Sequence, residues 1–166
     1  MYYLLGIDAG TTSMKGMLIN GEGKKICLVN ENYDLITPSN FFVEFEVENY
    51  WKTFKKVVKS VVYVSRVNPC RISAIAISSQ GETLICLDKN GEPLRKAIVW
   101  LDNRSIYEAE EIKNEFYIKE IYKVTGQPEV TATWPATKIL WLKKNEKHIF
   151  EETDKYLLVE DYLSYK

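Results

Sequence analysis

Residues 6–15 combine side chains that can bind phosphate. An acidic residue, Asp8, ends an apolar stretch, and Gly10 follows one residue beyond it. Three hydroxyl side chains and a cation complete the segment: Thr11, Thr12, Ser13 and Lys15. Backbone N–H groups and hydroxyls on a tight turn form a concave edge of donors for phosphate oxygens. The segment therefore predicts a phosphate-binding hairpin.

Asp8 is also a candidate ligand of Mg²⁺, through water, because this ion keeps much of its hydration shell and takes few protein carboxylates. The segment matches neither the GxxxxGK[ST] loop nor the GxGxxG turn that leads into a helix. On residue types alone, an ordinary Gly-Thr-Thr hairpin explains it equally well, with an aspartate that satisfies its own turn.

A second group of residues could bind the hydroxyls of a polyol or open-chain sugar. Glu82 and Asp102 supply carboxylate acceptors, and Trp100 supplies an aromatic wall for the C–H face. Each has an alternative role: Glu82 as a solvated turn residue, Trp100 as core, and Asp102 as the N-cap of a helix that begins near Asn103 or Arg104. For Arg104, an ion pair is favoured over contact with substrate.

The composition restricts the class of protein. The 166 residues hold 22 Lys and Arg against 23 Asp and Glu, a net charge of −1, which excludes a strongly basic nucleic-acid domain. Hydrophobic residues make up 46%, enough for one sizeable core. No stretch approaches the roughly 18 apolar residues of a membrane helix, and the first ten residues lack the basic and long apolar stretches typical of a secretory signal. A cytoplasmic protein without nucleic-acid or membrane partners is expected.

Three cysteines and one histidine argue against zinc, a disulfide framework and a Cys/His catalytic pair.

Hydrophobic periodicity predicts the elements that must position these side chains. Strands are expected at residues 2–8, 14–20, 25–35, 71–79, 83–88, 97–100 and 155–159. Helices are expected at residues 47–64, 106–116 and 117–124, from Pro135 onward, and from Glu160 to the end of the chain. Residues 38–40 are taken as a strand breaker. This order predicts a mixed α/β domain with an antiparallel edge.

Several motifs together resemble the FGGY family of carbohydrate kinases, a branch of the actin-like ATPase superfamily. After GIDAGTTSMKGML come, in the family's order, VEFEVENYW, SSQGETLICLDKNGEPLRKAIVWLDNRS and TGQPEVTATWPATKILWLKKNE. The resemblance implies an α/β, ribonuclease H-like domain, with a mixed sheet and flanking helices. It covers nearly the whole chain but roughly the first third of a typical member, so residues 1–166 are expected to be an incomplete N-terminal domain, with the second domain absent.

The resemblance implies ATP-dependent phosphorylation of a sugar or polyol hydroxyl, with ATP and Mg²⁺ as cofactors. ATP phosphates would meet Gly10, Thr11, Thr12, Ser13 and Lys15, and Asp8 would serve Mg²⁺. Gln80, Gly81 and Glu82 stand where relatives contact sugar hydroxyls, and Trp100 and Asp102 complete the predicted substrate set. The pair Gly81-Glu82 matches neither the Met-His of xylulose kinases nor the Arg-Glu of glycerol kinases, whereas WLDNRS looks more like the xylulose and gluconate branches.

The general base and the adenosine motif of the family lie downstream of these motifs, so residues 1–166 alone are expected to be inactive. A homodimer is left open. Two alternatives remain: a nucleotide-binding regulatory or assembly module without sugar chemistry, against which residues 80–82 and 100–104 argue, and a purely structural α/β domain.

Overall fold

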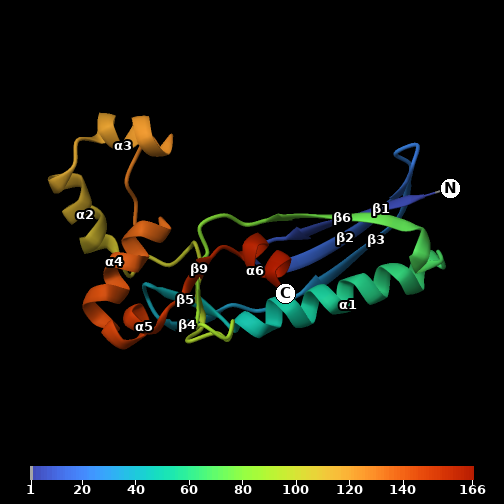
Figure 1. The fold of residues 1–166 in the computed structure, drawn as a ribbon, viewed down its shortest axis with the longest axis horizontal. Coiled ribbons are helices and arrows are strands. Elements are labelled where there is room, and N and C mark those ends of the chain that lie inside the picture. The colour runs from blue at the N-terminus through green and yellow to red at the C-terminus, as the bar shows by residue number, and fades with distance from the viewer. Residues whose placement is uncertain (1) are drawn as a thin grey trace. The chain divides into compact units, whose positions relative to one another are not determined.

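The computed structural model describes residues 2–166, and interleaved segments of the chain build two units (Figure 1). Unit 1 contains residues 2–35, Glu46–Gly81 and Val159–Lys166. Unit 2 contains Ile36–Phe45 and Glu82–Leu158. Within residues 2–166, no helix has both the length and the apolar character needed to cross a membrane. The phosphate segment thus lies in unit 1, and most of the predicted substrate residues lie in unit 2.

Unit 1 is built on a four-stranded mixed sheet. Its strands are β1 (Tyr3–Ala9), β2 (Ser13–Asn20), β3 (Lys25–Asn32) and β6 (Ile72–Ser79), in the order β3-β2-β1-β6. The first three are antiparallel neighbours, and β6 pairs with β1 in parallel. Buried and exposed residues alternate along β2, as expected for a strand with one covered face. The prediction of a mixed sheet with an antiparallel edge is confirmed.

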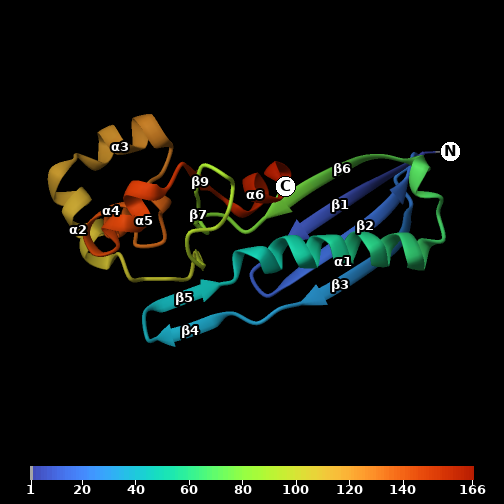
Figure 2. The same cartoon turned by 60° about the horizontal axis from the view of Figure 1, so that its bottom comes forward.

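Helix α1 (Val47–Ser65) covers one face of this sheet (Figure 2). Its buried side chains recur at helical spacing: Val47, Tyr50, Val57 and Val61. The helix approaches β2 most closely at Gly16, where a Cβ would lie 2.5 Å from Val57 Cγ1. The glycine is therefore needed for the close approach of the helix to the strand. A short 3₁₀ turn, η1 (Pro69–Arg71), precedes β6, and α6 (Val159–Tyr165) completes the unit.

Gly16→Ala in the full-length protein is expected to lower the free energy of unfolding by about 1–3 kcal/mol, the usual cost of overpacking. The new methyl group would also lie 3.0 Å from Val61 Cγ2, so two side chains of α1 must move. A denaturant titration measures the change. Gly6→Ala is the matched control, because its Cβ would lie 3.9 Å from the nearest atom, Met17 O. Equal stability of the two variants would contradict the packing argument.

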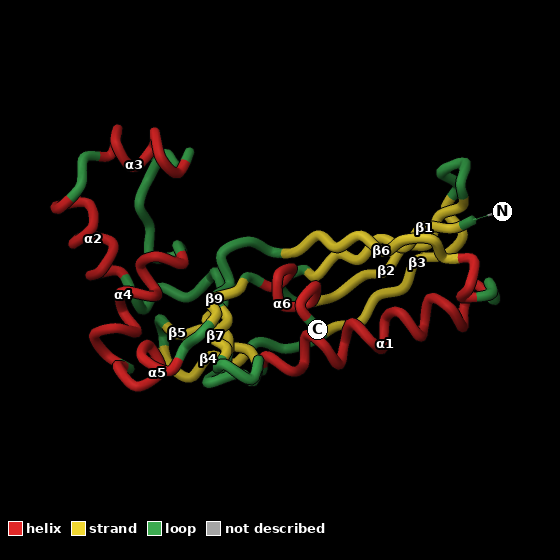
Figure 3. Tube along the Cα trace, in the orientation of Figure 1, coloured by secondary structure: helices red, strands yellow, loops and turns green. Residues whose placement is uncertain are grey.

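Unit 2 combines two small sheets with four helices (Figure 3). The strands β4 (Ile36–Ser39), β5 (Phe42–Phe45) and β8 (Ala97–Ile98) form one antiparallel sheet, and β7 (Ile85–Leu87) pairs with β9 (Lys155–Leu157) in the other. The helices are α2 (Ile106–Glu115), α3 (Ile118–Thr125), α4 (Pro135–Asn145) and α5 (Lys147–Glu152). A core between the strands β7 and β8 and the helices α4 and α5 contains Leu84, Cys86, Ile98, Leu142 and Ile149.

The sequence patterns missed several short elements. The β4–β5 hairpin was not predicted, since the segment with Pro38 reads as a breaker; Pro38 is in fact part of β4, at the edge of its sheet, where its missing N–H is tolerated. The strand β3 also ends at Asn32, three residues before the expected boundary at Leu35. Helix α5 was also missed, because six residues are too few for a clear period. The other predicted strands and helices are confirmed within a few residues.

Candidate functional site

The phosphate segment forms the turn between β1 and β2. In this hairpin Asp8 is paired with Lys15 and Ala9 with Met14, and Gly10 N donates to Ser13 O over 2.9 Å. The Asp8 carboxylate lies 3.5 Å from Lys15 Nζ, with 55% and 46% of the two side chains exposed. The turn therefore presents a carboxylate, an ammonium and hydroxyl residues together at one accessible end of the sheet. The predicted hairpin is confirmed, and its binding of phosphate stays a prediction.

A tyrosine that the sequence did not single out holds this turn. The hydroxyl of Tyr33 donates to Gly10 O, and Tyr33 N donates to Thr12 O over 3.0 Å. The ring of Tyr33 packs edge-on against Tyr50 of α1, with centroids 5.9 Å apart. Burial, and then the charge of Asp8, raise the pKa of Tyr33 above its usual value, so its phenol stays protonated well beyond neutral pH. In the sequence, Tyr33 showed only the alternation of a strand.

Gln80 lies beside the same hairpin. Its backbone N donates to Ala9 O over 2.9 Å, which extends the pairing of β1 with β6 beyond Ser79. Its side-chain Nε2 donates to the Tyr50 hydroxyl over 2.9 Å, while Oε1 is buried without a partner among the described residues. Gly81, exposed, ends the unit 1 segment. Gln80 is thus placed next to the phosphate turn, and its contact with substrate stays a prediction.

Glu82 begins the unit 2 segment in a conformation that is rare for a residue with a side chain. Its φ is +61°, in the left-handed region, which costs about 1–3 kcal/mol and persists only where the surroundings hold it. Its carbonyl accepts a hydrogen bond from Lys138 Nζ at 3.0 Å. The next residue, Thr83, is buried and accepts a hydrogen bond from Trp100 N at 3.1 Å. Unit 2 therefore brings the half-buried residues Glu82 and Trp100 close in space.

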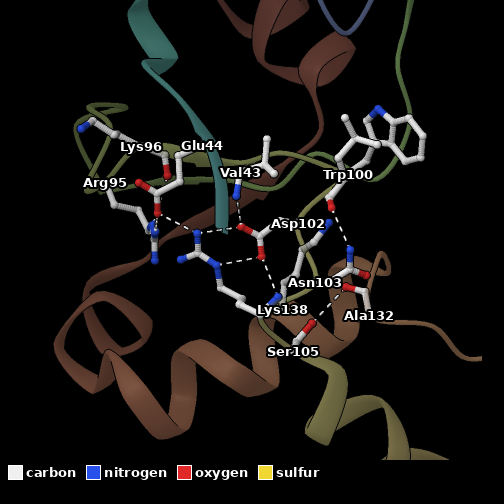
Figure 4. Close-up of polar contacts among 12 residues, drawn as sticks. Val43, Glu44, Arg95, Lys96, Trp100, Asp102, Asn103, Ser105, Ala132 and Lys138 are labelled. Atoms are coloured by element: carbon white, nitrogen blue, oxygen red, sulfur yellow. Dashed lines mark hydrogen bonds and ion pairs between the residues drawn. The ribbon is translucent and has the colours of Figure 1, made fainter. Parts of the chain in front are cut away.

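Asp102 is fully buried and held by the chain's own donors. Figure 4 shows its carboxylate beside Val43, whose N donates to Oδ2 over 2.6 Å. Arg104 donates to Oδ1 from N and Nε, each over 2.9 Å, and to Oδ2 from Nη2 over 2.8 Å. Burial lowers the pKa of Arg104, but hydrogen bonds and charges from Asp102 and Glu44 outweigh it and raise the pKa overall. Glu44 forms ion pairs with both Arg104 and Arg95. This cluster of Glu44, Arg95, Asp102 and Arg104 therefore links β5 to both segments that flank β8.

This cluster settles two interpretations of the sequence. The N-cap role for Asp102 is wrong, because no helix begins at Asn103 or Arg104; α2 begins at Ile106, and Ser105 is its N-cap residue. The ion-pair role for Arg104 is confirmed. A sugar contact by Asp102 stays a prediction, and it requires carboxylate oxygens that this arrangement commits to Arg104 and Val43.

The residues present fit Mg²⁺ only in part. Within residues 2–166, no group of three or more His, Cys, Asp or Glu side chains could hold a metal ion. Asp8 offers a single accessible carboxylate beside the donors of the turn. Such a ligand suits an ion that keeps several waters and is held mainly by substrate phosphates.

Comparisons with known proteins give the relatives of this chain. Residues 3–166 match the model of the FGGY family of carbohydrate kinases, N-terminal domain. A gluconokinase from Bacillus subtilis is 35% identical over 162 residues, which are 97% of this chain and 31% of the relative. A glycerol kinase from Thermoanaerobacter pseudethanolicus is 35% identical over 154 residues, covering 92% of this chain and 31% of the relative.

The fold agrees with these relatives. The structure of a ligand-bound xylulose kinase from Lactobacillus acidophilus superposes with a TM-score of 0.91 at 28% identity, over 99% of this chain and 33% of that protein. The predicted actin-like α/β fold is therefore confirmed, and the chain spans about a third of the length of the relatives it matches. Because the family match covers almost every residue, the chain belongs to the FGGY family of carbohydrate kinases, in the part that forms the N-terminal domain.

Proposed function

We propose that residues 1–166 are the N-terminal part of a kinase that transfers the γ-phosphoryl group of ATP to a hydroxyl of a small sugar or polyol. The observation that carries the proposal is the β1–β2 hairpin. In a chain of this family, it presents an accessible carboxylate and ammonium 3.5 Å apart next to a turn of hydroxyl residues. Donors and cations placed at a phosphate group are what phosphoryl transfer requires of a protein.

Each part of the hairpin has a role in this proposal. The N–H groups and hydroxyls of the turn bind ATP phosphates through Gly10, Thr11, Thr12 and Ser13. Lys15 adds a positive charge beside them. Asp8 would hold Mg²⁺ through its waters, and the bound ion would neutralise charge on the phosphates. Tyr33 holds the turn in shape through the carbonyl of Gly10.

The substrate side of the proposal rests on residues 80–82 and Trp100. A carboxylate at Glu82 can accept hydrogen bonds from sugar hydroxyls, and the indole of Trp100 can cover a C–H face. The relatives named gluconokinase and xylulose kinase make a gluconate-like or xylulose-like substrate our first choice, with glycerol as the next compound to test. We propose that the general base and the second domain follow residue 166, and that the enzyme works in the cytoplasm, where ATP is available.

The test is an assay of ADP release by the full-length protein with gluconate, xylulose and glycerol, each with ATP and Mg²⁺. Release that depends on one of these compounds is expected. Residues 1–166 alone should show no turnover, because they contain neither the proposed base nor an adenosine site. Tight ATP binding by the full-length protein with no sugar-dependent release would favour a nucleotide-binding module instead, and turnover by residues 1–166 would refute the proposed division of roles.

A further inference from the structure

We propose that Lys138 is a positioning residue that holds Glu82 in its sugar-binding conformation, an inference that rests on the proposed function. Lys138 belongs to α4 and is completely buried. Its Nζ donates to two backbone carbonyls, Glu82 O over 3.0 Å and Thr133 O over 2.6 Å. The side chain thus joins the start of the segment before β7 to the loop before α4.

The backbone of Glu82 needs such support. Its positive φ is unfavourable for any residue with a Cβ, and a strained conformation persists only where neighbouring groups hold it. The preceding residue, Gly81, is exposed, and a Cβ there would meet no atom within 4 Å, so it offers no packing that could fix the turn. The Lys138 ammonium contacts the Glu82 carbonyl itself. It therefore holds the peptide that follows Glu82, next to the Cα that carries the side chain.

The charge on Lys138 is costly where it lies. Burial lowers the pKa of Lys138 to about 8, and the nearby charge of Arg104 acts in the same direction, whereas the charges of Asp102 and Glu82 oppose them. An apolar side chain of similar length would fill the same space without burying an ammonium. What the ammonium adds at this position is therefore the hydrogen bonding of two carbonyls, one of which belongs to Glu82.

The experiment measures dissociation constants for sugar and for ATP separately, by calorimetry, in the full-length protein. The sugar is whichever of gluconate, xylulose and glycerol the wild type binds. Lys138→Met should raise the Kd for the sugar about 10-fold, the lower end of the loss expected from removing the Glu82 carboxylate itself, and leave the Kd for ATP unchanged. Lys143→Met, an exposed lysine on the same helix, is the matched control and should change neither constant.

A double variant separates positioning from general stability. If Lys138 acts through Glu82, then Lys138→Met should cause no further loss of sugar affinity when Glu82→Ala is already present. An unchanged sugar Kd in Lys138→Met, additive losses in the double variant, or equal losses for sugar and ATP would each overturn the inference. If Lys138→Met does not fold, Lys138→Leu, which also removes the donor, is measured in the same way and judged by the same criteria.

Failure of the proposed function would give a different result from failure of the positioning role. In that case the wild type itself would bind none of the three compounds, and both proposals would fall together. Wild-type binding with no effect of Lys138→Met or Lys138→Leu would remove only the positioning role.

Discussion

Asp8→Ala in the full-length protein is expected to lower kcat about 10²- to 10³-fold while the sugar KM changes little. This range is typical for the loss of one group that stabilises charge in a transition state. Negative charge redistributes over the phosphoryl oxygens as the γ-phosphate is transferred, and an Mg²⁺ ion held by Asp8 would neutralise it. The effect belongs in kcat because a group that acts on the transferring phosphoryl group contributes little to sugar binding in the ground state.

The position of Asp8 supports this expectation. Its carboxylate is more than half exposed, at the end of β1, and its one described ion pair, with Lys15, is long at 3.5 Å. The carboxylate is therefore accessible to a hydrated ion. Steady-state kinetics at saturating Mg²⁺ measure the change. Glu22→Ala is the control, since Glu22 is an exposed carboxylate in the turn that follows the far end of β2. An unchanged kcat in Asp8→Ala would favour the alternative interpretation of residues 6–15, an ordinary hairpin without a role in catalysis.

The parts of the fold that could be predicted are those with a local signal. The β1–β2 hairpin follows from two apolar runs that stop at a Gly-Thr-Thr turn, and α1 follows from apolar residues at three- and four-residue spacing. The end of α3 could also be predicted, because a glycine, Gly126, follows the apolar pattern of the helix. In the structure Gly126 adopts a φ of +74°, which suits a glycine at a helix terminus. In each case neighbouring residues carry enough information to specify the element.

The buried charges could not be predicted in the same way. Glu44 and Arg104 are far apart in the sequence, and nothing in either local pattern indicates that they lie 2.7 Å from each other. Lys138 left a weak signal, since it stands inside the run TKILWL, where a fully solvated lysine is unexpected. Its contact with the Glu82 carbonyl depends on tertiary packing, which one sequence does not reveal.

Glu82 is the residue for which both kinds of information matter. The sequence proposes its carboxylate as a sugar acceptor, and the structure adds a positive φ and a carbonyl held by Lys138. Glu82→Ala in the full-length protein is expected to weaken sugar binding by about 1.5–3 kcal/mol, the range for hydrogen bonds to a charged group, or roughly 10- to 150-fold in Kd. ATP affinity should hardly change, because the variant leaves the β1–β2 hairpin intact.

The positive φ supplies a sharper control than alanine alone. Glu82→Gly also removes the carboxylate, but glycine adopts this φ without steric cost, so the glycine variant should unfold at a higher temperature than Glu82→Ala. If the carboxylate binds the sugar, both variants lose similar affinity in separate titrations with sugar and ATP, despite their different stabilities. If Glu82 is only a turn residue, sugar affinity stays at the wild-type value in Glu82→Gly. Both explanations predict a higher melting temperature for Glu82→Gly than for Glu82→Ala, but only sugar binding by the carboxylate predicts a raised sugar Kd in both variants. Melting curves and titrations on this one pair of variants therefore distinguish the two explanations.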